Sequence, residues 1–419
     1  MSLSVNQSAV FGVYYVTSAY FVLPYFVTIS IGLYNNFLLS SISFNLDTLF
    51  LNWNTSFPAV TVCEIYNGEK IWDVSEEYFG SDHDLTLDDF VGEIVFFRGT
   101  CTSCSKKCTT TQCPNNFTEL LNVFRSKCAK LIINCSYTNK VFNCCEEFRP
   151  IETEYGTCYA FNSNQARKIS QIYHANNRET GAGHLKFDTS ADIQLHVHPP
   201  IEIPFLFSEG MIHETVLLGT VKEIVLNVME VYNDATVYHL ALDQRRCRFV
   251  NELTNWGQRL GIYKYYSFST CVVECAVALQ LEHCNCTSHF LAAAIKSTNQ
   301  ISMCDYRGLR CLTKVYTEMK ELRKSCDCMS SCDEPEYNIV YNSADGENEE
   351  ESDVTQIKVS LIELPTQRYV RRVTKGYLDL IISIGGIAGL FFNASVIRLV
   401  EVIFMLVQLR WQQLKTNFL

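Results

Sequence analysis

The twenty cysteines of this 419-residue chain constrain its fold most strongly. All of them lie between Cys63 and Cys332, and the segments on either side contain none. Reduced cytosolic thiols in such a cluster would have to bind metal, whereas an oxidising compartment would pair an even number as disulfides. Four Asn-x-Ser/Thr sequons fall between residues 34 and 375. We therefore expect this stretch to be extracellular and glycosylated at Asn54, Asn116, Asn134 and Asn285.

The N-terminal segment is apolar and carries no charged side chain before Asp47. Its run from Ala9 to Leu33 would form a helix about 37 Å long, enough to cross a bilayer core of about 30 Å. A signal peptide is the alternative, but it would need a basic start and a shorter apolar run. Because the first Lys or Arg is Lys70, the sequence favours a membrane span over 9–33 after a short cytoplasmic segment, 1–8.

The C-terminal segment is also apolar, with only three charged side chains in residues 376–408. Arg410 and Lys415 follow it closely, and basic residues flanking a span favour the cytoplasmic side. We therefore expect a second membrane helix over 376–408 and a cytoplasmic tail over 409–419. Two spans place both termini in the cytoplasm and the cysteine-rich middle outside, as in a multi-pass plasma-membrane protein.

Small and polar residues occupy the middle of this second span. Gly386 and Gly389 would allow another helix to approach closely. Ser383 and Asn393 are polar, and polar groups at that depth are costly unless they face a cavity or one another. The span therefore has two interpretations, tight helix packing or the lining of a pore whose oxygens replace part of an ion's hydration shell.

The remaining composition excludes several functions. The net charge of −11 lacks the basic surface that nucleic acids require. The chain contains no Gly-x-Ser-x-Gly, His-Glu-x-x-His or P-loop motif. We therefore do not expect an enzyme, a cofactor or a nucleic-acid partner.

Local patterns predict the order of the elements in the extracellular part. The β-branched residues of 57–63 predict a strand directly after the first span. Residues 85–133 contain helix start signals and the spacing of apolar residues that is typical of helices. In residues 185–250 apolar and polar residues alternate, as they do in strands. Residues 268–332 are expected to be helical. The fold class is therefore α+β.

The cysteines of this last region predict a ladder of disulfides. Cys271 and Cys275 share one helix face, and a second helical run over 312–324 is followed by Cys326 and Cys328. An antiparallel hairpin of the two helices would nest the bridges, outer cysteine with outer cysteine. The pairs are Cys271–Cys328, Cys275–Cys326, Cys284–Cys311 and Cys286–Cys304, with Cys247–Cys332 closing the base.

Metal sites are the competing interpretation of these cysteines and of two histidines. Spacings such as Cys284-x-Cys286 suit zinc poorly, and the compartment favours disulfides. For the same reason we expect bridges rather than metal among the cysteines left over. His196 and His198 share one face of a strand, where a zinc or proton-sensing role competes with ordinary strand packing, which we favour. The cysteines outside the ladder include Cys101, Cys104, Cys108, Cys113, Cys128 and one of Cys144 and Cys145.

Several motifs together resemble the epithelial sodium channel/degenerin superfamily, most closely its insect pickpocket branch. Phe57–Cys63 is similar to the family's signature after the first span, and Tyr155–Asn162 to its Gly-x-Cys-Tyr-x-Phe-Asn motif. Arg246–Phe249 and Tyr266–Cys271 resemble the segment that leads into the thumb, and Gly385–Ser395, followed by Glu401, resembles the pore helix. The match covers nearly the whole chain.

The resemblance implies a trimer, homomeric or heteromeric, whose two membrane helices per subunit support a disulfide-rich extracellular domain. That domain would contain a helical finger over about 64–133, a helical thumb over about 257–335, and a β palm between and after them. The resemblance also implies disulfides Cys63–Cys158 and Cys135 with Cys144 or Cys145. The implied function is a sodium-permeable, amiloride-sensitive channel opened by an extracellular stimulus that the sequence does not identify. Sodium ions, the lipid bilayer and related subunits are the implied partners.

The same resemblance assigns pore residues. Asn393-Ala394-Ser395 aligns with the family's Gly-x-Ser selectivity belt, and Ile382 with a site where bulky residues hold channels open. Arg398 below the belt departs from the family, as does the lack of its His-Gly motif before the first span. These departures support the alternative, a non-conducting modulatory subunit or cysteine-rich surface receptor. The residues expected to line the pore or gate are Ile382, Ser383, Gly386, Gly389, Arg398 and Glu401.

Overall fold

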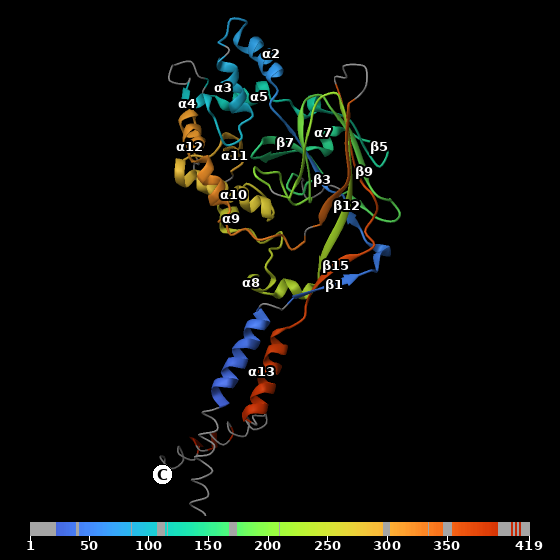
Figure 1. Cartoon of the computed structure of the whole chain (residues 1–419), viewed down its shortest axis with the longest axis vertical. Coiled ribbons are helices and arrows are strands. Elements are labelled where there is room, and N and C mark those ends of the chain that lie inside the picture. The colour runs from blue at the N-terminus through green and yellow to red at the C-terminus, as the bar shows by residue number, and fades with distance from the viewer. Residues whose placement is uncertain are drawn as a thin grey trace, which may run out of the picture. The chain divides into compact units, whose positions relative to one another are not determined.

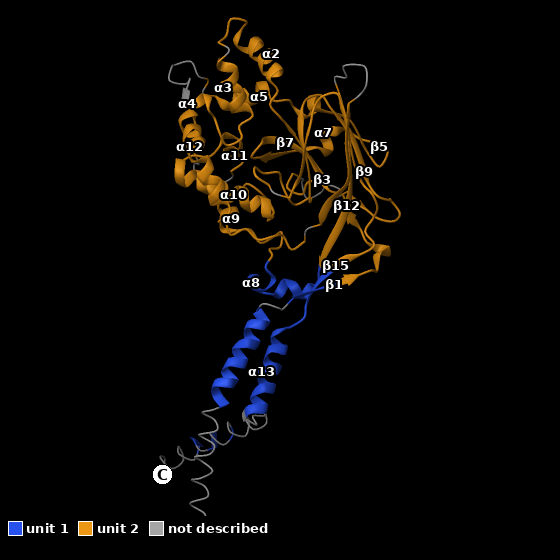
Figure 2. Ribbon diagram, in the orientation of Figure 1, with its two compact units in different colours: residues 1–45, 233–246, 370–419 blue, residues 46–232, 247–369 orange. Residues whose placement is uncertain are grey.

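A computed structural model describes most of the chain between residues 22 and 392. The described residues are 22–38, 42–84, 86–106, 114, 116–166, 174–208, 210–295, 302–333, 335–346, 354–392, 404, 407–408 and 410–411. The chain divides into two compact units (Figure 2). Unit 1 contains residues 1–45, 233–246 and 370–419, and unit 2 contains residues 46–232 and 247–369.

Unit 1 contains two long helices, one over residues 22–38 and α13 over Tyr377–Phe392. The aromatic ring of Phe37 in the first helix and that of Tyr377 in α13 have centroids 5.2 Å apart. The first helix continues past the end predicted at Leu33, because Asn35 and Asn36 do not adopt the left-handed conformation that would end it. Among the described residues of the unit are also two short helices, η2 over Ala235–His239 and α8 over Leu242–Arg245.

Unit 2 is built on two β-sheets (Figure 1). An eight-stranded sheet, whose outer strands β1 and β15 reach the unit boundary, has the order β1-β15-β12-β14-β9-β4-β5, with β13 also paired to β12. A five-stranded sheet has the order β11-β10-β3-β7-β6, and β2 pairs with β8. The strands are β1 Ile42–Asp47, β2 Thr55–Ser56, β3 Ala59–Glu64, β4 Ile132–Tyr137, β5 Lys140–Val141, β6 Arg149–Thr153, β7 Gly156–Phe161, β8 Ala175–Asn176, β9 His184–Thr189, β10 Ile193–His198, β11 Ile212–Val216, β12 Thr220–Asn233, β13 Glu336–Gly346, β14 Thr355–Leu361 and β15 Arg368–Val373.

The core of unit 2 follows from the two-residue period of its strands. Val60 and Val62 of β3 point into one hydrophobic cluster with Phe187 of β9 and Val359 of β14, so this cluster lies between the two sheets. Cys63, on the other face of β3, packs with residues of α10 in a second cluster. Strand β3 is therefore buried on both faces, which explains its continuous run of apolar residues.

Helices cover the face of the five-stranded sheet that is turned away from the eight-stranded sheet, and they extend to one side of the sheets (Figure 1). Polar caps begin several of them: the side chain of Asn67 accepts a hydrogen bond from the backbone N–H of Lys70, and Ser267 accepts one from Thr270. The helices are η1 Phe50–Asn52, α2 Gly68–Phe79, α3 Thr86–Val95, α4 Ser103–Lys106, α5 Phe117–Phe124, α6 Cys128–Leu131, α7 Cys144–Glu147, α9 Asn255–Leu260, α10 Phe268–Cys284, α11 His289–Ala292 and α12 Tyr306–Arg323.

Two sequence expectations differ from this arrangement. The strand pattern predicted over 185–250 ends at Asn233, because the Asp234 carboxylate accepts a hydrogen bond from the Thr236 N–H at 3.0 Å and starts η2. Prolines 199, 200 and 204 also interrupt that stretch, since proline cannot donate to a ladder. Among the described residues of 268–332, helix occupies three pieces, and residues 324–332 leave the helix to reach their disulfide partners.

Candidate functional site

Helix α13 carries the described part of the predicted pore. The Ile382 side chain is 61% exposed, and the Ser383 hydroxyl donates to the Asp379 carbonyl one turn earlier at 2.7 Å. Gly386 is exposed and Gly389 is partly exposed. The other predicted pore residues, Asn393, Ala394, Ser395, Arg398 and Glu401, lie outside the described residues.

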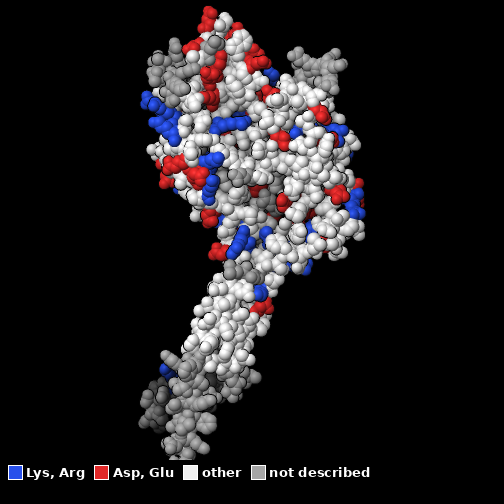
Figure 3. Space-filling model, viewed as in Figure 1, with Lys and Arg blue, Asp and Glu red and all other residues white. Residues whose placement is uncertain are grey.

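The long helices of unit 1 expose apolar side chains on several faces. Leu390 of α13 is 81% exposed, and Tyr25 of the first helix is 68% exposed. A Cβ added at Gly32, Gly385 or Gly386 would meet no atom within 4 Å. In Figure 3 the surface of these helices is almost free of Lys, Arg, Asp and Glu. Over the described ranges, no single helix combines the length and the hydropathy needed to cross a membrane.

The structure brings together every cysteine pair that the sequence and the resemblance suggested. Cys284 at the end of α10 bonds to Cys311 in the first half of α12, and Cys275 in the middle of α10 bonds to Cys326 beyond α12. These bonds fix α10 and α12 as an antiparallel hairpin (Figure 1). The other bonds of this group are Cys63–Cys158, Cys135–Cys144, Cys247–Cys332, Cys271–Cys328 and Cys286–Cys304.

The leftover cysteines also form bridges where they are described. Cys101 bonds to Cys104, and Cys128 bonds to Cys145. Cys108 and Cys113 lie outside the described residues. No described group of three or more His, Cys, Asp and Glu side chains is arranged to hold a metal ion.

The four predicted glycosylation sites lie on the surface. Asn54, Asn116, Asn134 and Asn285 are all exposed. Asn116 is the N-cap of α5, and Asn285 ends α10 in the left-handed conformation with a φ of 54°. Solvent can therefore reach the side chain of each of the four asparagines.

The two histidines of β10 differ in their surroundings. His198 bonds to the Thr61 hydroxyl at 2.8 Å and to the Pro199 carbonyl at 2.8 Å, and burial lowers its pKa to about 4. His196 is fully buried, its ring centroid lies 5.1 Å from that of Tyr155 at a tilt of 46°, and neither ring nitrogen has a hydrogen-bond partner. Burial lowers the pKa of His196 well below its ordinary value of 6.5. Both imidazoles are therefore neutral near pH 7.

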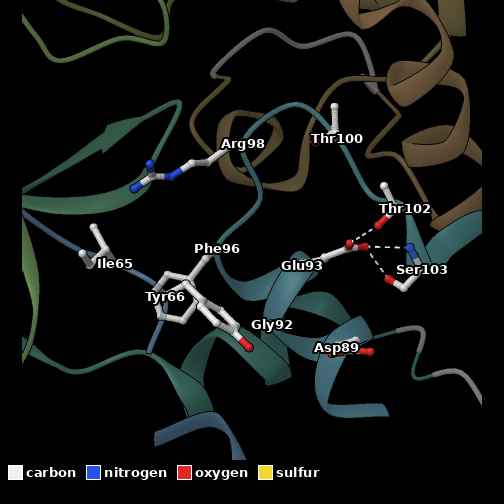
Figure 4. A pocket seen from close by; sticks show the side chains of 10 residues that line it. All are labelled: Ile65, Tyr66, Asp89, Gly92, Glu93, Phe96, Arg98, Thr100, Thr102 and Ser103. Carbon is white, nitrogen blue, oxygen red and sulfur yellow. Dashed lines mark hydrogen bonds between the residues drawn. The ribbon is translucent and has the colours of Figure 1, made fainter. Parts of the chain in front are cut away.

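A cavity of about 740 Å³ lies beside α3 in unit 2 (Figure 4). Its wall comes from three segments: the end of β3, helix α3, and the loop that leads to α4. Ligand sites are commonly of this size and combine apolar surface with a few polar groups. The lining residues are Ile65, Tyr66, Asp89, Gly92, Glu93, Phe96, Arg98, Thr100, Thr102 and Ser103.

Glu93 connects two walls of this cavity. Its carboxylate accepts hydrogen bonds from the hydroxyls of Thr102 and Ser103 and from the backbone N–H of Ser103 at 2.8 Å. These donors are neutral, so they orient the carboxylate without cancelling its charge. Figure 4 shows Glu93 reaching from α3 toward the loop, with Asp89 one turn earlier on the helix.

Two aromatic rings form the opposite wall. Tyr66 is 51% exposed, and its ring meets Phe96 edge to face, with centroids 6.2 Å apart. A Cβ at Gly92 would lie 2.5 Å from the Tyr66 ring, so only glycine lets this ring lie against α3. Arg98 is directed away from the carboxylates: its guanidinium donates to Gln194 at 3.2 Å and lies 5.4 Å from the centre of the Tyr155 ring.

The sequence analysis missed this cavity. Asp89 and Glu93 fall within the stretch 85–133 that is expected to be helical, and neither they nor Tyr66 and Arg98 are predicted to line a site. The i, i+4 spacing of Asp89 and Glu93 was the available signal, since it places both carboxylates on one helix face. The partners of Glu93 follow it by nine and ten residues, so no helical or strand period could have revealed them.

The comparisons of sequence with known proteins agree with one another. The family model described as amiloride-sensitive sodium channel matches residues 8–405. Pickpocket protein 19 of Drosophila melanogaster is 22% identical over 70% of this chain and 63% of its own length. Pickpocket protein 28 of the same species is 22% identical over 84% and 67%. Degenerin del-1 of Caenorhabditis elegans is 22% identical over 70% and 47%.

The chain therefore spans about half to two thirds of the length of these relatives. Among solved structures, a proton-activated chloride channel aligns over 95% of this chain and 99% of its own, but with a TM-score of 0.28 and 6% identity. Those values are too low to support a shared fold. The family match instead extends through the unit 2 sheets, the disulfide hairpin and both apolar helices. On this evidence the chain belongs to the amiloride-sensitive sodium channel family.

Proposed function

We propose that this chain is a subunit of a trimeric, sodium-permeable and amiloride-sensitive cation channel. The observation that carries the proposal is the family match over residues 8–405, which includes the first apolar segment and all but the last three residues of the second. Under this proposal, residues 9–33 and 376–408 span the plasma membrane, both termini are cytoplasmic, and residues 34–375 form the extracellular finger, palm and thumb. The nine described disulfides and the exposed sequons support that orientation.

Helix α13 lines the pore in this proposal. Its open glycines support a close approach by helices of other subunits, because nothing within this chain occupies the space beside Gly385 and Gly386. Ser383 keeps acceptor lone pairs free for a hydrated ion, because its hydroxyl proton is used within the helix. The belt residues Asn393, Ala394 and Ser395 would then coordinate sodium below them.

The direct test is electrical recording from cells that express the chain alone and together with related subunits. We expect an inward sodium current that amiloride blocks. The Asn393→Gly variant should shift the reversal potential between sodium and potassium solutions, because it removes a side chain from the narrowest part. The conducting role would be refuted by surface delivery without sodium current in every combination.

Cysteine accessibility tests the pore lining separately. A cysteine at Ser383 should react with a water-soluble thiol reagent and reduce the current. A cysteine at Ile381, two residues away and on the opposite face of α13, is the matched control and should react slowly. Equal rates at the two positions would argue against this lining.

The second candidate is a non-conducting modulatory subunit or surface receptor. Arg398 in the second apolar segment favours it, since a cation below the belt would repel sodium. This candidate predicts altered currents from sibling subunits, with no change in their reversal potential when Asn393 is replaced.

A further inference from the structure

We propose that the cavity beside α3 binds an organic ammonium ion with a small aromatic body. Under the proposed function, on which this inference rests, such an amine would be an extracellular ligand that regulates the channel. The cavity belongs wholly to unit 2, and every residue used below lies within the described ranges.

The charge of the cavity selects a cation. Glu93 and Asp89 both line it, on one face of α3. The bonds to Glu93 come from Thr102 and Ser103, which are neutral, and in the described part of the chain no salt bridge joins Glu93 to a Lys or Arg. A ligand ammonium placed here would meet a carboxylate that is already oriented. An anion of similar shape would be repelled by the same group.

The aromatic wall selects the body of the ligand. Tyr66 and Phe96 meet edge to face, so their π faces point in different directions. The Arg125 guanidinium lies 5.4 Å from the centre of the Phe96 ring, so the Tyr66 face is the one that can receive a ligand cation while Phe96 packs on an apolar group. Gly92 leaves room for the edge of the Tyr66 ring, because a Cβ there would lie 2.5 Å from it. An arylalkylamine presents the two matching parts, an ammonium group and a flat apolar body.

Arg98 sets the orientation of the ligand. It lines the cavity, but its guanidinium is engaged with Gln194 and Tyr155 at the end away from Glu93 (Figure 4). The ammonium group is therefore expected at the Glu93 end, and the aromatic body toward Arg98. Removing the Arg98 charge should strengthen binding of a cation, which a merely damaged structure would not do.

The cavity wall is also attached to the disulfide hairpin. The loop that supplies Thr102 and Ser103 is closed by the Cys101–Cys104 bridge. The backbone N–H of Cys101 donates to the Thr313 hydroxyl of α12 at 2.8 Å. A ligand that contacts this loop therefore acts on a segment docked onto α12, which offers a route from binding to the hairpin.

The test is a binding measurement on the purified full chain in detergent, which requires no current. The probe is 2-phenylethylamine, and its neutral control is 2-phenylethanol, which differs only in the terminal group. Isothermal titration calorimetry should show the amine binding at least about tenfold more tightly than the alcohol, given a desolvated cation–π contact and a carboxylate. Phenylacetate, the anionic counterpart, should not bind.

Variants locate the site. Glu93→Gln should weaken amine binding by about tenfold and leave the alcohol unchanged, since only the charge is removed. Arg98→Gln should strengthen amine binding by about threefold, through relief of like-charge repulsion. Glu77→Gln, an exposed residue of α2 that does not line the cavity, is the matched control and should change neither.

Equal binding of the amine and the alcohol, or tighter binding of phenylacetate, would overturn the inference. So would an Arg98→Gln variant that remains folded and binds the amine no better than the parent. Binding without sodium current in any subunit combination would refute the channel and leave the site intact. Sodium current without amine binding would refute the site and leave the channel intact.

Discussion

At the scale of single residues, Glu274 of α10 is a buried acid whose titration should be visible in stability. It is 2% exposed, its Oε1 atom has no hydrogen-bond partner, and burial raises its pKa from 4.5 to about 7. The folded chain therefore holds this proton more tightly than the unfolded chain does. The contribution to stability is fully present below pH 4.5 and is lost as the pH rises through 7.

The Glu274→Gln variant should remove this pH dependence. At pH 8 we expect it to be more stable than the parent by up to about 3 kcal/mol, the free energy that corresponds to raising the pKa from 4.5 to about 7, and at pH 4.5 by little. Thermal unfolding followed by intrinsic fluorescence at the two pH values measures the difference. A variant that is equally destabilised at both would contradict the assignment.

His196 and His198 form a matched pair on β10. His196→Leu removes an imidazole whose two nitrogens lack partners, so we expect a gain of about 1 kcal/mol. His198→Leu breaks the bonds to Thr61 and Pro199, so we expect a loss of about 2 kcal/mol. Thermal unfolding at pH 7 compares them, and changes of the same sign would count against this account of the strand.

The stability that the His196→Leu variant gains over the parent should grow as the pH falls. Because its pKa is lowered in the folded state, the stability linked to His196 is present above pH 6.5 and is lost progressively below it. The unfolded parent takes up a proton there, and the leucine variant does not. The difference in unfolding temperature between the parent and the His196→Leu variant should therefore be larger at pH 5 than at pH 7.

At the scale of elements, the hairpin of α10 and α12 should respond to cysteine removal in a non-additive way. With Cys271–Cys328 intact, the Cys275–Cys326 bridge closes only a short loop, so its removal should cost about 2 kcal/mol in the chain-entropy view. Removing both bridges opens a much longer loop, and the cost should exceed the sum of the two single losses. The free energy of unfolding is measured for Cys→Ala variants that lack one bridge, the other bridge, or both. A combined loss equal to the sum of the two single losses would contradict this prediction.

The hairpin also shows what sequence could predict. Cys271 and Cys275 lie four residues apart, and this local spacing with an antiparallel partner was enough to suggest the pairing. The alternation of side chains predicted strand β12 but not where it ends. The strand ends at the cap made by Asp234, which is a single side-chain hydrogen bond and leaves no periodic pattern in the sequence. The cavity was missed because Tyr66, Glu93 and Ser103 come from separate segments that only the tertiary fold brings together.

At the scale of the whole molecule, the exposed sequons permit a test of orientation. If residues 34–375 face the secretory lumen, Asn54, Asn116, Asn134 and Asn285 should carry glycans when the chain is made in animal cells. Glycosidase treatment should increase gel mobility, and each Asn→Gln change should remove one step. An Asn→Gln change at Asn342, an exposed asparagine outside any sequon, is the control. Mobility unaffected by glycosidase would contradict the orientation.

The apolar side chains left uncovered on α13 determine how the protein can be handled. Leu378, Ile381, Ile382 and Leu390 are each more than 60% exposed, and no described part of the chain shields them. Water alone is a poor environment for such a surface, so in plain buffer the molecules would gather through it. A biochemist who isolates this polypeptide must therefore supply an amphiphile from the first extraction step, and the choice of amphiphile becomes one of the variables of every measurement.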